Sequence, residues 1–228
     1  MFKKIIFVGL AALSVQVGSA HATPNLLTNG SFESSLNGWV SSGGGVYPIA
    51  VIITNGSTGS ASGEVVPADT ISSGSPDAAG THGVYFVDDY AHQVLSQSLY
   101  LATGHYEIGF DAYAPLNGYN NRGDASFSGT IAGILLANYT VHTQQSPKNW
   151  FHYSGIANVL VDGIYNVAFD FKPYGGFAAD VVVDRVYITT SEQTGGVRIE
   201  SVIPEPATLA LFGLGLAGLV TLRRGKVQ

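Results

Sequence analysis

Short runs of alternating apolar and polar residues, separated by turn residues, constrain the fold of this chain more than any other feature. A period of two residues indicates strands with one buried face, because successive strand side chains point to opposite faces. No sustained helical period of 3.6 residues occurs between residues 23 and 190. The expected strands are 47–53, 83–87, 97–101, 105–113, 129–136, 150–156, 165–171 and 181–189.

The connections between these runs have the composition of tight turns. Asparagine followed by glycine tolerates left-handed backbone angles at little cost, and the chain has this pair at Asn29-Gly30, Asn37-Gly38, Asn55-Gly56 and Asn117-Gly118. We therefore predict an all-β fold, an antiparallel β-sandwich of roughly eight to ten strands with jelly-roll topology. We expect a hinge-like loop at 41–45 and a long surface excursion at 54–80, where large apolar residues are few.

The N-terminal sequence is typical of a secretory signal peptide. Lys3 and Lys4 precede an apolar stretch over residues 5–17, and Ala20-His21-Ala22 is a small-x-small cleavage pattern. The apolar stretch is shorter than the roughly 20 residues that a membrane-spanning helix needs. We predict a signal peptide over 1–22 with cleavage after Ala22, and the alternative is a retained anchor.

The C-terminal sequence predicts a short membrane helix with basic residues after it. Pro204-Glu205-Pro206 precedes an apolar run over 207–222, and Arg223 and Arg224 follow. At 1.5 Å per residue this run covers roughly 24 Å, which spans a membrane with local thinning or snorkelling of its basic flank. The positive-inside bias would keep the arginines in the cytoplasm and the rest of the chain outside.

The order of these elements resembles the PEP-CTERM sorting signal, which would occupy residues 204–228. The resemblance implies recognition and cleavage by an exosortase in the inner membrane. The protein would then reach the outer surface or extracellular matrix of a Gram-negative bacterium. An ordinary one-span anchor is the alternative. Between the two ends we expect one domain at 23–190 and a linker at 191–203.

Charge and cysteine content exclude several classes of function. Fifteen of the sixteen acidic residues but only five of the ten basic residues lie between 23 and 203. This excess of negative charge argues against nucleic acid binding, because it repels phosphate backbones. The chain has no cysteine, which excludes thiol catalysis and disulfide stabilisation of an exported domain.

A second resemblance covers the domain itself. Its segments are Asn25–Glu33 with Gly38-Trp39, Leu95–Gln97 followed by Tyr106–Phe110, Trp150–Tyr153, and Val181–Val186. In this order they resemble the strands of galactose-binding-like jelly rolls, a fold that includes carbohydrate-binding modules. The resemblance implies a structural calcium ion, Ca²⁺, between the first and last strands. By motif position Glu33 and Asp184 would supply carboxylates and Ser31 a carbonyl, whereas Gly80 and Thr81 stand where a third acidic ligand is usual. The alternative is that both carboxylates are simply solvated.

Aromatic residues near a turn are candidates for sugar binding. Exposed rings can stack on sugar rings while polar groups bond the hydroxyls, and the turn contains Tyr113, Tyr119, Asn120 and Asn121. Tyr90 and Tyr174 are further candidates. Buried tyrosines are equally typical of β-sandwich cores, and we expect Trp39 and Trp150 to belong to the core.

Catalytic signatures are missing from the sequence. Asp88 and Asp89 are adjacent, so on a strand they would point to opposite faces and could not flank one glycosidic bond. The histidines follow no metal-binding spacing, and no nucleophile elbow or phosphate loop occurs. We therefore expect a non-enzymatic exported protein associated with exopolysaccharide or biofilm. The alternatives are a surface-displayed carbohydrate-binding module and a surface glycan hydrolase or lyase.

Overall fold

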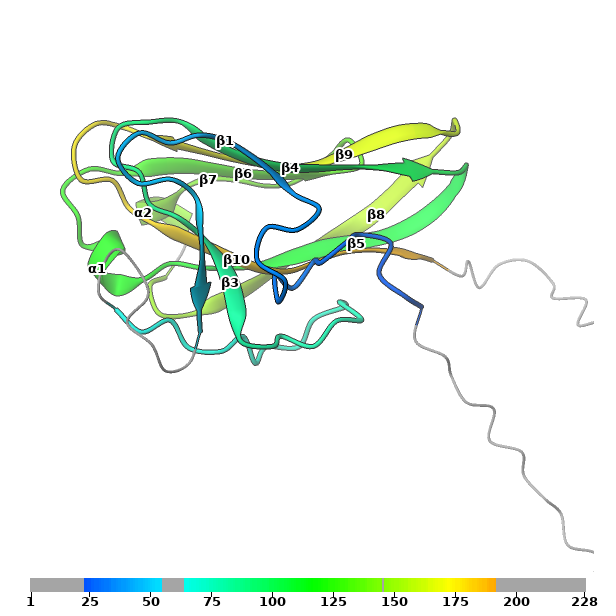
Figure 1. Ribbon diagram of the computed structural model, residues 1–228, viewed down its shortest axis with the longest axis horizontal. Coiled ribbons are helices and arrows are strands. Elements are labelled where there is room, and N and C mark those ends of the chain that lie inside the picture. The colour runs from blue at the N-terminus through cyan, green and yellow to red at the C-terminus, as the bar shows by residue number, and fades with distance from the viewer. Residues whose placement is uncertain (1–22, 55–63, 145, 192–228) are drawn as a thin grey trace, which may run out of the picture. The chain divides into compact units, whose positions relative to one another are not determined.

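The computed structural model of the chain describes residues 23–54, 64–144 and 146–191. These residues form two antiparallel five-stranded sheets that pack face to face (Figure 1). The predicted all-β sandwich is therefore confirmed. No helix in the described ranges is long and apolar enough to cross a membrane. The predicted signal peptide, the predicted linker after residue 191 and the tail with the helix predicted at 207–222 lie outside the described residues.

One sheet has the strand order β1-β4-β9-β6-β7 and the other has the order β2-β3-β10-β5-β8. The strands of the first sheet are β1 (Val40–Gly43), β4 (Gln93–Leu101), β9 (Gly163–Pro173), β6 (Ala125–Ile131) and β7 (Ile134–Thr140). Those of the second are β2 (Ala50–Ile53), β3 (His82–Phe86), β10 (Val181–Thr190), β5 (Gly104–Tyr113) and β8 (Trp150–Val159). Two one-turn helices, α1 (Leu116–Tyr119) and α2 (Val141–Gln144), lie in connections.

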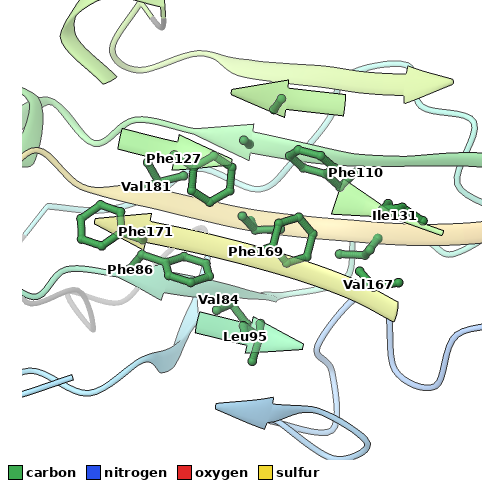
Figure 2. Close-up of a cluster of buried hydrophobic side chains, with 14 of the residues drawn as sticks. Val84, Phe86, Leu95, Phe110, Phe127, Ile131, Val167, Phe169, Phe171 and Val181 are labelled. Atoms are coloured by element: carbon green, nitrogen blue, oxygen red, sulfur yellow. The ribbon is translucent and has the colours of Figure 1, made fainter. Parts of the chain in front are cut away.

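Phenylalanine rings fill the space between the sheets (Figure 2). Phe110 meets Phe169 edge to face at 4.9 Å between ring centroids, and Phe127 stacks on Phe169 at 6.0 Å. All three side chains are fully buried, as are Phe86 and Phe171 beside them. Edge-to-face and offset contacts between aromatic rings add stability beyond the burial of their area. Trp39 and Trp150 are also buried, as predicted.

Two expected boundaries are wrong. The strand predicted at 129–136 is a hairpin, in which β6 and β7 pair through a two-residue turn at Ala132 and Gly133. Both residues have positive φ, of 48° and 82°, which is the geometry that joins twisted antiparallel strands most tightly. The apolar run continues through this turn, so the alternation alone concealed it. The hinge predicted at 41–45 is instead largely β1, which pairs with β4.

The sandwich has two distinct ends (Figure 1). We call the end with the connections 44–49, 87–92, 114–124 and 174–180 the loop end, where α1 lies. We call the other the tail end, where the turns after β4 and β8 lie and β10 finishes. Residues 64–80, the described part of the expected surface excursion, contain no strand. They cover part of the outer face of the second sheet, where Val66 packs in a cluster with Tyr113 and Trp150.

Candidate functional site

A pocket of about 240 Å³ opens at the loop end of the sandwich. Four separate connections contribute to it, and two aromatic side chains, two amides and two carboxylates line it beside one valine. These residues are Tyr47, Val87, Asp89, Asn117, Asn121, Phe177 and Asp180. Tyr47 and Phe177 are exposed, whereas Asp180 is buried. Rings therefore stand at the exposed part of the pocket and a carboxyl group lies deep in it.

Asp88 and Gln93 hold the wall that carries Tyr47. One carboxylate oxygen of Asp88 accepts hydrogen bonds from the backbone N–H groups of Gly45 and Tyr47, at 2.7 and 3.1 Å. The other accepts from Tyr90 and Ala91. Burial opposes the charge of Asp88, but these four bonds outweigh it and lower the pKa of its carboxyl group. Gln93 donates to the carbonyl of Tyr47 at 2.8 Å.

Hydrogen bonds to its backbone fix the opposite wall, residues 174–180. Asp89 accepts the N–H of Ala178 at 2.7 Å, and Asn121 donates to the carbonyl of the same residue at 2.7 Å. The N–H of Gly123 donates to the carbonyl of Phe177 at 3.0 Å. Phe177 has a φ of 52°, an uncommon conformation for a residue with a large side chain. Its exposed ring is thus held on a constrained backbone.

Asp180 lies at the inner side of the pocket between Tyr85 and Gly118. The Tyr85 hydroxyl donates to its carboxylate at 2.7 Å. A Cβ at position 118 would come within 2.2 Å of the same carboxylate, so only glycine fits there. Burial raises the pKa of Asp180 to about 7, with a smaller contribution from the charge of Asp89, while the Tyr85 bond opposes this rise. Asp180 can therefore be protonated near neutral pH.

The predicted sugar-binding turn contributes one of its expected residues, Asn121, to this pocket, but neither of its two tyrosines. Tyr113 is buried and packs on Trp150 at 5.2 Å between ring centroids, so it cannot be an exposed platform ring. Tyr119 is partly buried, and its hydroxyl donates to the carbonyl of His142 at 3.0 Å. Asn120 is exposed but does not line the pocket. The alternation of apolar and polar residues cannot show which loop residues meet in a pocket. The sequence therefore did not predict Tyr47 and Phe177 as site residues.

Tyr90 and Tyr174 are exposed, as a sugar platform requires, but neither lines the pocket.

The residues predicted to bind calcium occupy different surroundings. The exposed carboxylate of Glu33 accepts the N–H groups of Thr81 and His82 at 2.7 and 2.8 Å. Asp184 is buried, and one oxygen accepts the N–H of Arg185 while the other has no hydrogen bond. Ser31 is half-buried. Within the described ranges no three histidine or acidic side chains form a metal-binding cluster, so the calcium site stays a prediction.

A second polar cluster lies on the outer face of the second sheet. A β-bulge at Asp184–Tyr187 interrupts β10, and Arg185 has a φ of 46° there. The Arg185 guanidinium contacts Asp69 at 2.7 Å and approaches Asp111 at 2.8 Å. His152 contacts Asp111 at 2.6 Å. Burial raises the pKa of Asp111 and lowers that of His152. Two buried carboxyl groups, those of Asp69 and Asp111, thus share one guanidinium, and the buried Asp184 precedes Arg185 in the chain.

Beside this cluster lies an open cleft of about 410 Å³. Its lining residues are Gly74, Glu107, His152, Ser154, Gly155, Ile156 and Tyr187. The Tyr187 ring lies directly on Gly109, where an added Cβ would approach the ring within 2.6 Å. Tyr187 itself is buried. This cleft is not lined by an exposed tyrosine or phenylalanine ring, whereas the pocket at the loop end combines two such rings with polar side chains. The pocket at the loop end is therefore the better candidate for binding a sugar.

Residues 202–224 match the model of the PEP-CTERM protein-sorting motif. The chain carries a PEP-CTERM sorting motif. This confirms the resemblance of the C-terminal sequence to that sorting signal and indicates an exported protein that is processed at the membrane. A comparison with curated proteins yields no match.

Solved structures similar to this chain include carbohydrate-binding modules. TmCBM61, solved in complex with beta-1,4-galactotriose, aligns with 74% of this chain and 100% of its own at 18% identity and a TM-score of 0.51. The CBM22-1 xylan-binding domain from Paenibacillus barcinonensis Xyn10C aligns with 75% of this chain and 97% of its own, at 17% identity and a TM-score of 0.40. The Stig cyclase Fisc from Fischerella sp. TAU aligns with 75% and 98%, at 16% identity and a TM-score of 0.45. The likeness to TmCBM61 confirms the fold, which does not by itself decide between binding and catalysis.

Proposed function

We propose that this exported protein binds a polysaccharide in the pocket at the loop end of its β-sandwich. One observation carries the proposal: the exposed rings of Tyr47 and Phe177 lie in the same pocket as Asn117, Asn121 and two aspartates. Small-molecule sites are concave and combine apolar surfaces with a few convergent polar groups. Sugars have apolar ring faces and many hydroxyls, and this pocket offers partners for both.

The sorting motif supports a location for this binding. An exosortase would recognise residues 204–228 at the inner membrane, and the β-sandwich would then be displayed on the outer surface or in the matrix of a Gram-negative bacterium. The excess of negative charge between residues 23 and 203 suits the solubility of an exported domain. The polysaccharide in this proposal is the exopolysaccharide of the producing cell, which connects the protein with biofilm.

Binding to exopolysaccharide tests the proposal directly. Phe177→Ala should lower retention on immobilised exopolysaccharide at least tenfold, because it removes an exposed ring of the pocket. Tyr100→Ala is the matched control, since Tyr100 is 62% exposed and Phe177 is 63% exposed. Tyr100 lies on β4 near the tail end and should not affect retention. Equal retention of both variants and the parent protein would remove the pocket from the proposal.

Asp89 and Asp180 favour glycan hydrolysis as a second candidate function. Glycoside hydrolases use two carboxyl groups, one of them protonated by a raised pKa. Asp180 has such a raised pKa and shares the pocket with Asp89. The assay is release of reducing ends from exopolysaccharide by the parent protein and by Asp180→Asn. We expect no release from either, and release that is lost in the variant would establish the enzyme instead.

A further inference from the structure

Four large apolar side chains form an exposed patch at the tail end of the sandwich. They are Tyr100, Leu160, Val161 and Ile164, which we call the tip patch, and they are between 62% and 73% exposed. Tyr100 and Ile164 are direct partners in the antiparallel pairing of β4 with β9. Leu160 and Val161 lie in the turn that joins β8 to β9. Contiguous apolar surface of this kind marks an interaction site more often than single exposed residues do.

Hydrogen bonds hold the backbone around the tip patch in place. Asp162 accepts both the N–H and the hydroxyl of Thr103 at 2.6 Å, which ties the turn after β8 to the turn after β4. The Tyr165 hydroxyl donates to the carbonyl of Val161 at 2.8 Å. The exposure of Leu160 and Val161 therefore belongs to an ordered turn, which presents both side chains outward.

The chain leaves the β-sandwich at the same end. Thr190 pairs with Tyr106 at the end of β10, and the N–H of Ser191 donates to the carbonyl of His105 at 2.9 Å. These partners directly follow the turn after β4 (Figure 1). Only residues 192–201 separate Ser191 from the matched sorting motif. Ten residues span at most roughly 36 Å when fully extended.

We propose that the tip patch docks on the lipid surface of the membrane while the sorting motif is held there. The inference rests on the membrane step of the proposed sorting. A tyrosine beside leucine, valine and isoleucine suits the interface of a bilayer, where amphipathic rings lie at the headgroup level and aliphatic chains enter below. The short connection keeps the tip patch at high effective concentration near the membrane. Docking would orient the loop end, and with it the pocket, away from the bilayer.

The absence of cysteine makes a single fluorescent label possible. The test reconstitutes the full chain in phosphatidylcholine vesicles containing a nitroxide-labelled lipid, with a bimane label at Leu160→Cys. The matched control is Val46→Cys at the loop end, because Val46 is 75% exposed and Leu160 is 73% exposed. We expect the lipid nitroxide to quench the label at position 160 at least threefold more than the label at position 46. Adding Ile164→Ser should lower the quenching at position 160.

Flotation of the vesicles separates this inference from the sorting proposal. Protein that does not float with the vesicles contradicts membrane insertion of the tail, and with it the sorting step. Protein that floats but shows equal quenching at positions 160 and 46 overturns the docking alone. A label at 160 that is blue-shifted but insensitive to the lipid nitroxide also overturns it, because the chain itself or a second copy would then cover the tip patch.

Discussion

The guanidinium of Arg185 forms two contacts with Asp69: Nε donates to one carboxylate oxygen at 2.7 Å, and Nη2 lies 2.7 Å from the other. This two-point contact fixes the segment around residue 69 to the bulge in β10. Arg185 Nη2 also donates to the carbonyl of Ile71 at 2.8 Å. A single side chain thus fastens a segment without strands to the middle strand of the second sheet.

Arg185→Met should therefore destabilise the fold strongly. It would remove the cation that contacts the buried carboxyl groups of Asp69 and Asp111, and breaking a buried ion pair on one side costs about 3–5 kcal/mol. Urea unfolding followed by circular dichroism measures the free energy of unfolding. Arg122→Met is the control, because Arg122 is exposed, and it should change stability by less than about 0.5 kcal/mol. Equal effects of the two variants would contradict the anchoring role.

The free energy of unfolding should fall as pH rises from about 4 to about 7, in part because of Asp180. Burial first, and then the charge of Asp89, raise the pKa of Asp180 to about 7, whereas the unfolded value is close to 3.8. The folded state binds the extra proton in this window, so stability is greatest below the unfolded pKa and is lost toward the folded one. One such group contributes a slope of at most about 1.4 kcal/mol per pH unit.

Asp180→Asn should flatten this part of the pH dependence. Urea unfolding at a series of pH values from 4 to 8 measures the slope for the parent and the variant. Glu107→Gln serves as the control, since Glu107 is exposed on β5 and should leave the slope unchanged. An unchanged slope in Asp180→Asn would show that this carboxyl group titrates normally in the folded protein.

Tyr119→Phe should lower stability by about 1 kcal/mol, the usual net value of one hydrogen bond. The hydroxyl of Tyr119 donates to the carbonyl of His142 and ties α1 to α2, while the ring meets His142 edge to face at 5.0 Å between centroids. Phe110→Ala is the reference for loss of a fully buried ring and should lower the free energy of unfolding by about 3–5 kcal/mol. Thermal melts of both variants measure these effects, and an unchanged melt of Tyr119→Phe would show that the bond contributes nothing.

Calcium should stabilise the protein if Glu33 and Asp184 are drawn to a common ion. Binding to the folded state alone adds about 2.7 kcal/mol when free calcium is 100 times Kd. Chelation should then lower the melting temperature of the parent protein, and Glu33→Gln should abolish the difference. Glu107→Gln should retain it. Identical melting curves with calcium and with chelator would exclude a stabilising site.

Removal of residues 204–228 should release the protein into the medium. The tail carries the motif that an exosortase would recognise, so the shortened chain would be exported without retention. Replacing Pro204-Glu205-Pro206 by three alanines should leave an unprocessed, membrane-held form. Immunoblots of the medium and of membrane fractions show where each of the two variants accumulates. Normal processing of the triple-alanine chain would contradict recognition of this triplet.

The sequence predicts the sheets of this protein far better than its pocket. Alternation located most strands because each has one buried face, and it failed at Ala132-Gly133, where the apolar run passes through a turn. The pocket is different, because Tyr47, Asn121 and Phe177 come from three connections that no local pattern relates. Their meeting depends on how strands far apart in sequence pair. The turn predicted to bind sugar contains Asn117 and Asn121, which line the pocket. Its two tyrosines do not: Tyr113 is buried, and the Tyr119 hydroxyl bonds the carbonyl of His142.

The position of β10 has a mechanical consequence. This strand has neighbours on both sides, β3 and β5, and its last residue leads to the tail. A polysaccharide held at the loop end and a tail held at the other end would pull the domain lengthwise, along this strand. The backbone hydrogen bonds on both sides of β10 would then carry the load together in shear instead of opening one after another. The strand that leads to the tether is therefore well placed to resist force.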